Sequence, residues 1–172
     1  PHGPAAVRLT PAVDRVIAEL RLSDLRDLAP AVQRCRRIAD LDADPSAVDA
    51  TLAADPLLAP LVAATPGLRA PGAADADEVV TRAVLGQQVS VAGARTLASR
   101  LVAGHGEPLR EPVGGVTHAF PSAATIAGMR PDDFAMPRAR GATLIGACAK
   151  VADGEIVLDA GSDREGAVAA LQ

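Results

Sequence analysis

The sequence predicts a mostly α-helical fold in which two strands and a helix precede a larger set of helices. Apolar residues recur at helical spacing from about residue 27 onward, whereas residues 5–22 carry two β-branched runs with partial alternation. Hydrophobic residues make up 49% of the 172 residues but aromatic residues only 1%. Ala, Val and Leu must therefore fill the interior, which favours closely packed helices over an aromatic-rich β-sandwich.

Residues 5–22 are predicted to form two antiparallel strands, "AVRLT" and "DRVIAELRL", separated by Pro11. Because two strands alone are marginally stable in water, we expect them to belong to a larger sheet whose remainder is missing from this sequence or lies elsewhere. After Ser23 the spacing of the apolar residues changes from strand-like alternation to the spacing of a helix. The residues of one helical face are Leu28, Val32, Cys35 and Ala39, and they predict a helix that begins near Asp27.

Two short helices are predicted in residues 44–67, each opened by an Asp-Pro pair. The pairs are Asp44 with Pro45 and Asp55 with Pro56. An Asp side chain caps the first turn of a helix, and Pro suits the first helical position because its missing N–H is not needed there. A Pro-Gly pair ends this set.

The best-defined predicted unit is a pair of helices joined by a corner at residues 86–90. Asp75 and Glu78 stand at capping-box spacing at the start of the first helix. Its predicted apolar stripe consists of Val79, Val80, Ala83 and Val84. Ser90 can cap the second helix. The apolar side of that helix consists of Val91, Ala94, Leu97, Ala98, Leu101 and Val102.

Residues 106–120 are predicted to be a loop, because two prolines and Gly114-Gly115 interrupt every regular pattern. Shorter elements follow. We expect a helix from Ser122 to about Ala127, a turn at Pro131, a longer helix from about 138 to 151, and an extended piece at 155–159. A capping box of Ser162 and Glu165 predicts the last helix.

Composition and spacing argue against several kinds of site. The formal net charge is −4, with 17 basic and 21 acidic residues, so overall charge gives no attraction for a polyanion. Cys35 and Cys148 lack metal-ligand spacing and are predicted to be reduced core residues, as in a reducing cytoplasm. The three histidines lie in a terminus and in loops without Cys or His neighbours, so we predict no metal and no cofactor. Asp132-Asp133 is interpreted as helix capping rather than a catalytic pair.

No segment has the length of uninterrupted apolar sequence that a membrane span needs, and the first ten residues lack the pattern of a signal peptide. We therefore expect a cytoplasmic protein with no membrane partner.

The stretch "LGQQVSVAGAR", residues 85–95, places two neutral amides at the predicted helix–helix corner. Two interpretations are open from the residues alone. The amides can satisfy the free backbone groups where one helix ends and the next begins. Alternatively, they can present hydrogen-bonding groups to something inserted there, such as an opened base pair.

A resemblance to a known family extends over nearly the whole chain. Residues 83–108, "AVLGQQVSVAGARTLASRLVAGHGEP", closely resemble the helix pair of the DNA-3-methyladenine glycosylase II family, the alkylation-repair branch of the helix-hairpin-helix DNA glycosylases. Four more segments resemble the family in its order: "LRDLAPAVQRCRRIADLDADP", "DPLLAPLVAATPGLRAPG", "HAFPSAATIA" and "MPRARGATLIGACA". The resemblance implies that residues 1–45 are the C-terminal part of an N-terminal sheet domain and residues 46–172 a partial helical glycosylase core.

Such enzymes hydrolyse the N-glycosidic bond of alkylated bases in double-stranded DNA after rotating the damaged nucleotide out of the duplex. In the family, the corner between the two helices supplies a wedge that fills the vacated space. Gln88 stands at the matching position. The resemblance thus implies a DNA-binding corner made of Gln87, Gln88, Val89 and Ser90.

The sequence departs from the family where the chemistry is expected. A Leu-Pro-Gly-x-Gly-like hairpin and a catalytic aspartate after it are absent from these 172 residues, as are the aromatic residues that stack on the flipped base. We therefore expect a chain truncated at both ends, with no catalytic residue of its own and no turnover by itself.

Two other interpretations are open. The chain can be a non-catalytic helical DNA-binding or scaffold module, and such a module can be fused to an adaptive-response methyl-transfer regulator. The iron–sulphur branch of the glycosylases fits less well, because its members lack the sheet-domain segment seen at residues 5–45. We expect a monomer that associates with the nucleoid when bound to DNA.

Overall fold

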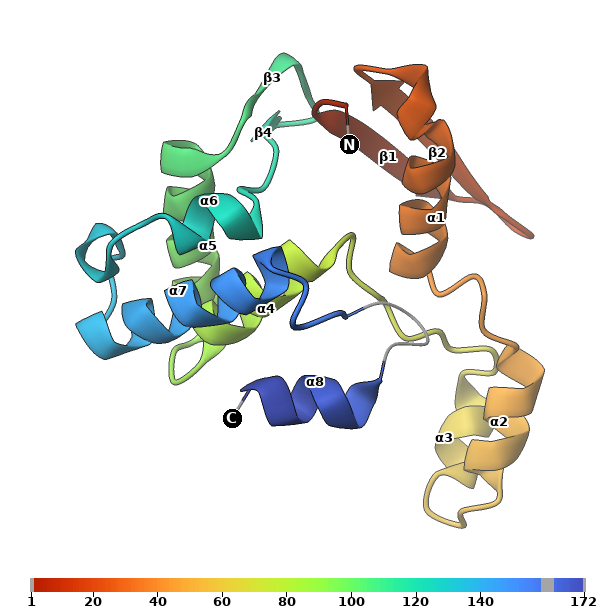
Figure 1. Cartoon of the computed structure of the whole chain (residues 1–172). Coiled ribbons are helices and arrows are strands. Elements are labelled where there is room, and N and C mark those ends of the chain that lie inside the picture. Colours follow the sequence, from red (N-terminus) through yellow and green to blue (C-terminus); the bar gives the residue numbers. More distant parts are fainter. Residues whose placement is uncertain (1, 159–162, 172) are drawn as a thin grey trace.

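Helices dominate the structure and are accompanied by two separate two-stranded sheets (Figure 1). This computed structural model describes residues 2–158 and 163–171. The elements are β1 (Ala5–Pro11), β2 (Val16–Leu22), the 3-10 helix η1 (Leu25–Asp27), α1 (Leu28–Ile38), α2 (Pro45–Ala53), α3 (Ala59–Ala64), α4 (Ala76–Gly86), α5 (Val91–His105), β3 (Pro108–Val113), β4 (Val116–His118), α6 (Ala123–Ala127), the 3-10 helix η2 (Pro131–Asp133), α7 (Arg138–Ala152) and α8 (Arg164–Leu171).

The N-terminal part confirms the predicted strand pair and the helix after it. β1 and β2 are antiparallel, with Ala5 opposite Leu22 and Pro11 opposite Val16. Pro11 fits because it ends its strand, where the missing N–H matters least. Among the described residues, β1 and β2 pair only with each other. α1 begins at Leu28, one residue after the predicted start.

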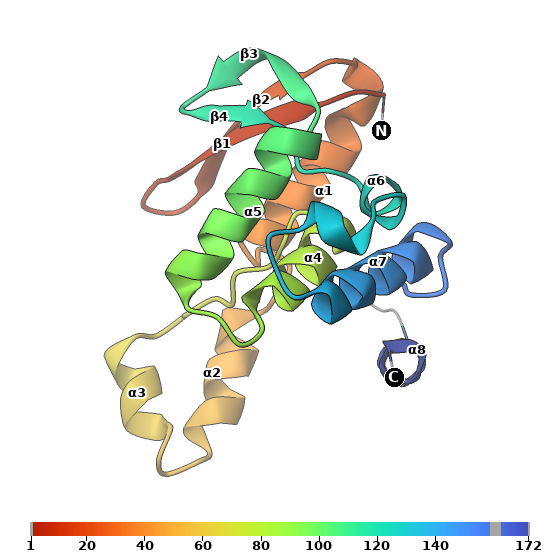
Figure 2. The same cartoon turned by 90° about the vertical axis from the view of Figure 1, so that its left-hand side faces the viewer.

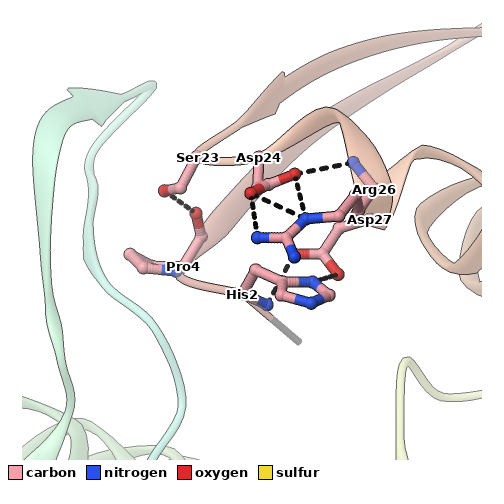
Figure 3. Close-up of polar contacts among 6 residues, drawn as sticks. All are labelled: His2, Pro4, Ser23, Asp24, Arg26 and Asp27. Carbon is pink, nitrogen blue, oxygen red and sulfur yellow. Dashed lines mark hydrogen bonds and ion pairs between the residues drawn. The ribbon is translucent and has the colours of Figure 1, made fainter.

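The first residues of the chain are tied to the start of α1 (Figure 3). The Asp27 carboxylate accepts hydrogen bonds from the His2 backbone N–H at 2.7 Å and pairs with His2 Nδ1 at 3.0 Å. The Ser23 hydroxyl donates to the Pro4 carbonyl at 2.7 Å. These contacts hold the N-terminal segment beside η1.

The core lies where α4, α6 and α7 pack together. Leu85, Ile126 and Leu144 are almost completely buried there. Cys148 is also buried, and its Sγ lies 3.7 Å from the Thr81 hydroxyl, which gives that buried polar group a partner. Cys35 is buried in α1, and both cysteines are free thiols, as predicted.

The helix caps predicted from local sequence are confirmed. Asp44, Asp75, Ser90 and Ser122 each accept a hydrogen bond from a backbone N–H of the following first turn. The corresponding helices therefore begin where the sequence predicts.

The predicted apolar stripe of α4 is half wrong. Val80 and Val84 are buried, but Val79 is 39% exposed and Ala83 is exposed. Thr81 and Leu85 are buried instead. The helix is turned toward α7, and a helical pattern of small aliphatic residues does not by itself specify which neighbour it meets.

The predicted loop at 106–120 contains the β3–β4 hairpin, so that prediction is wrong. Gly114 (φ +56°) and Gly115 (φ +89°) form its turn in the left-handed region, where glycine has no steric penalty. The two glycines that suggested a break thus allow the hairpin. This sheet lies beside β1–β2, and Arg21 Nη1 pairs with Glu111 at 3.2 Å (Figure 2).

Two further boundaries differ from the prediction. Asp55 caps a turn, accepting from Leu57 N–H at 2.7 Å, and α3 begins only at Ala59. Residues 155–158 form no strand. Ser162 lies outside the described residues; Asp163, which precedes α8, accepts from Glu165 N–H at 3.1 Å. No described helix is long and apolar enough to cross a membrane.

Candidate nucleic-acid interface

The α4–α5 corner is a four-residue connection with defined ends. Leu85, almost fully buried, anchors the end of α4, and the Gln87 N–H donates to the Val84 carbonyl at 3.2 Å. On the other side, the Ser90 hydroxyl accepts from Gly93 N–H at 3.1 Å and starts α5. A backbone group thus caps the end of α4 and the Ser90 side chain caps the start of α5, and neither glutamine side chain bonds to these helix ends.

Gln88 has a left-handed backbone, with φ +57°. Non-glycine residues adopt this conformation at a steric cost, and such residues concentrate at sites where the position of a side chain matters. The turn brings the chain sharply from α4 into α5. Residues 86–91 are all exposed, and Val91 is 72% exposed.

The two amides of the corner differ in their contacts. Arg140 Nη2, from the first turn of α7, donates to Gln88 Oε1 at 3.4 Å. The Gln87 side chain has no hydrogen bond in the part of the chain that the structure describes. All four predicted residues, Gln87, Gln88, Val89 and Ser90, are therefore together on one exposed corner, and their contact with DNA stays a prediction.

The carboxylates near the start of α7 serve structural roles. Asp133 accepts from the Arg130 backbone N–H at 2.8 Å and pairs with the Arg130 guanidinium at 2.9 Å. The side-chain hydrogen bond from Arg130 lowers the pKa of Asp133, so this group stays ionised and is a poor proton donor. Asp132 pairs with Arg138.

Two of the histidines have partners that explain them without a metal. His2 pairs with Asp27, and His118 Nδ1 lies 2.8 Å from the Thr117 hydroxyl. Within residues 2–158 and 163–171, no three His, Cys, Asp or Glu side chains are grouped closely enough to hold a metal ion.

A cavity that sequence reasoning missed lies between α2 and α3. Its volume is about 380 Å³, and its apolar lining includes Val48, Leu52, Leu58 and Leu61. The Asp49 carboxylate at its edge already accepts from Gly67 N–H at 2.7 Å. The clustered leucines of "DPLLAPLVAAT" were a signal of an apolar surface, although they indicated no ligand.

The class of fold follows from solved structures. A 3-methyladenine DNA-glycosylase from Archaeoglobus fulgidus matches with a TM-score of 0.68 and 18% identity, over 84% of this chain and 51% of that protein. The apo-form 8-oxoguanine glycosylase/lyase of Clostridium acetobutylicum matches with a TM-score of 0.72 and 18% identity, over 96% and 57%. The fold is that of the helix-hairpin-helix DNA glycosylases.

Sequence comparison identifies individual relatives of the chain. Residues 1–75 match the model of the AlkA N-terminal domain. The chain is 48% identical over 163 residues to the probable bifunctional transcriptional activator/DNA repair enzyme AlkA of Mycobacterium tuberculosis H37Rv, which covers 95% of this chain and 33% of that protein. It is 32% identical over 173 residues to DNA-3-methyladenine glycosylase 2 of Escherichia coli K12, over 96% and 58%.

The chain is therefore homologous to AlkA and DNA-3-methyladenine glycosylase 2 over most of its length, which confirms the resemblance seen in the sequence. It spans about a third of the mycobacterial relative and just over half of the E. coli one. The domain division at residues 45 and 46 stays a prediction.

Proposed function

We propose that these residues belong to a DNA N-glycosylase of base excision repair that flips out and removes alkylated bases of the 3-methyladenine type. The observation that carries the proposal is the homology to DNA-3-methyladenine glycosylase 2 over 96% of the chain. The exposed α4–α5 corner supports it, because neither glutamine side chain is used as a cap of the two helices.

In this proposal the corner enters the duplex where the damaged nucleotide leaves. Unstacking a base costs a few kcal/mol, and a side chain that fills the gap offsets part of that cost. The alkyl stem of Gln88 occupies the vacated stack while its amide bonds to the base left without a partner. Val89, exposed beside it, adds apolar surface.

These 172 residues do not supply the bond-breaking step. The family's hairpin motif, after which its catalytic aspartate follows, is absent from the sequence. The acidic pair before α7, Asp132 and Asp133, forms ion pairs with Arg138 and Arg130. Bond cleavage therefore needs residues other than these.

The test compares the purified 172-residue chain with the product of the complete open reading frame that encodes it. Each is incubated with methylated DNA, and released 3-methyladenine is quantified by chromatography. We expect release by the complete product and none by the 172-residue chain. If neither protein releases the base, the proposed activity is overturned. If the purified 172-residue chain releases it, the proposed need for other residues is overturned.

A second candidate function is a non-catalytic DNA-binding module attached to a regulator that accepts methyl groups. The mycobacterial relative supports this second candidate, because its name describes a probable bifunctional transcriptional activator and DNA repair enzyme. The chain matches 33% of that protein. This candidate predicts binding of double-stranded DNA without base release by the complete product.

We also propose that the protein is a monomer in the cytoplasm. Light scattering checks its oligomeric state, and cell fractionation checks its location.

A further inference from the structure

The contact between Arg140 and Gln88 joins residues 52 positions apart, from α7 and the α4–α5 corner. α7 packs along α4, whose last turn contains the buried Leu85. The Arg140 guanidinium therefore reaches the corner from a helix of the core. Arg140 is partly buried, and no other partner of its side chain exists among the described residues. Its guanidinium is therefore directed at one group, the Gln88 amide.

This contact determines which way the amide faces. A guanidinium has only donors, so it must meet the amide oxygen, and the Oε1 of Gln88 is the atom within 3.4 Å of Nη2. The Nε2 amino group is then left on the other side as a donor. Gln87, next in the chain, has no such contact and can turn its amide either way.

We propose that Arg140 is a positioning residue that fixes the Gln88 amide with its NH₂ group outward and so makes the corner prefer thymine to adenine as the unpaired base. This inference rests on the proposed wedge function. Thymine carries carbonyl acceptors on both sides of its pairing edge, whereas the pairing edge of adenine has one acceptor beside an amino donor. An outward NH₂ donor therefore suits the partner of a flipped adenine.

The experiment uses the product of the complete open reading frame and 20-base-pair duplexes that contain a tetrahydrofuran abasic analogue opposite T, C, A or G. Affinity is measured by fluorescence anisotropy at one fixed salt concentration. A net difference of one hydrogen bond between the two unpaired bases gives the wild type about 5-fold tighter binding with T than with A. Arg140→Ala reduces this ratio to about 1, Arg140→Lys restores part of it, and Gln88→Ala abolishes it.

The double variant separates positioning from simple charge. If Arg140 acts through Gln88, adding Arg140→Ala to Gln88→Ala leaves the affinity for each duplex unchanged, whereas a direct charge contact with DNA weakens all four duplexes in that background as well. Arg100→Ala, which removes an exposed charge from α5, is the matched control and keeps the T-to-A ratio. Urea midpoints of all variants show whether each is folded.

The outcomes distinguish this inference from the proposed function. A wild type without T preference, an Arg140→Ala variant that keeps it, or one that weakens all four duplexes by the same factor overturns the role of Arg140. If the wild type binds no abasic duplex more tightly than intact DNA, the proposed function itself fails. Loss of affinity in Gln88→Ala without any effect of Arg140→Ala leaves the wedge intact and removes only the positioning role.

Discussion

Gln88 holds a left-handed backbone conformation that glycine adopts without steric penalty and glutamine does not. Gln88→Ala and Gln88→Gly both remove the amide, so their difference in stability measures the backbone alone. We expect Gln88→Gly to be more stable to urea than Gln88→Ala by about 1 kcal/mol. Equal unfolding free energies for the two variants would show that the corner relaxes this φ angle.

Gly141 in α7 is required by close packing. A Cβ at this position would lie 2.8 Å from the Pro131 carbonyl oxygen, which is backbone and cannot turn aside. Gly146, one and a half turns later in the same helix, has nothing within 4 Å of a Cβ. We expect Gly141→Ala to lower the free energy of unfolding by about 1–3 kcal/mol.

The matched substitution Gly146→Ala should raise that free energy by about 0.5–1 kcal/mol, since Ala is the better helix former. Thermal or urea unfolding of both variants checks the pair. A stabilising effect at Gly141 would contradict the tight approach of α7 to η2.

The residues of the corner could be predicted from the sequence, but the partner of Gln88 could not. Gln88 was assigned to the corner because family segments on either side set the register, and its role in DNA binding stays a prediction. Arg140 belongs to a segment that also matched the family, yet nothing local relates it to a residue 52 positions earlier. Such a contact depends on how α7 packs along α4, which is a tertiary property.

At the scale of the elements, helix caps could be predicted from the sequence, whereas the face that a helix buries could not. The caps of Asp44 and Ser90 act within three residues, so the sequence contains both donor and acceptor. The buried face of α4 depends on α7, and small aliphatic residues on both faces left the choice open. The β3–β4 hairpin was missed because glycine breaks regular structure and also forms tight turns.

The N-terminal segment and η1 form a pH-sensitive contact (Figure 3). Hydrogen bonds from His2, the backbone one first, lower the pKa of Asp27, and the Arg26 side chain lowers the pKa of Asp24. A lowered folded-state pKa means that the stabilisation is complete above the unfolded pKa of about 3.9 and is lost as the pH falls through the folded value.

We therefore expect the His2 amide resonance to move to its released position only below about pH 4. An NMR titration from pH 7 to pH 2 follows it. Asp27→Asn should show the released position throughout. A resonance that titrates in the same way in that variant would rule out the Asp27 contact as its cause.

Across the whole molecule, burial is unevenly distributed. α4 and α7 contain fully buried side chains, whereas none of the residues in α2, α3, β1 or β2 is buried. α2 and α3 project from the remaining helices in both views (Figures 1 and 2). Segments with few buried contacts open at lower free energy than the core.

Hydrogen exchange measured by mass spectrometry should therefore show the slowest exchange in α4 and α7 and the fastest in β1–β2 and α2–α3. Substituting Leu144 by Ala, which empties a fully buried site, should accelerate exchange in α4 and α7 more than in α2–α3. Uniform acceleration throughout the chain would indicate one cooperative unit instead.

The chain enters and leaves the α2–α3 pair at the same place. The Asp40 carbonyl accepts from Arg69, its carboxylate accepts from Ala70 N–H at 3.0 Å, and the Ile38 carbonyl accepts from Gly72 N–H at 3.2 Å. Residues 41–68 are thus a closed excursion whose two ends are already joined. Because closing a shorter loop costs less entropy, this pair of helices can be exchanged for a brief linker, or for a different insert, without changing the path of the chain on either side.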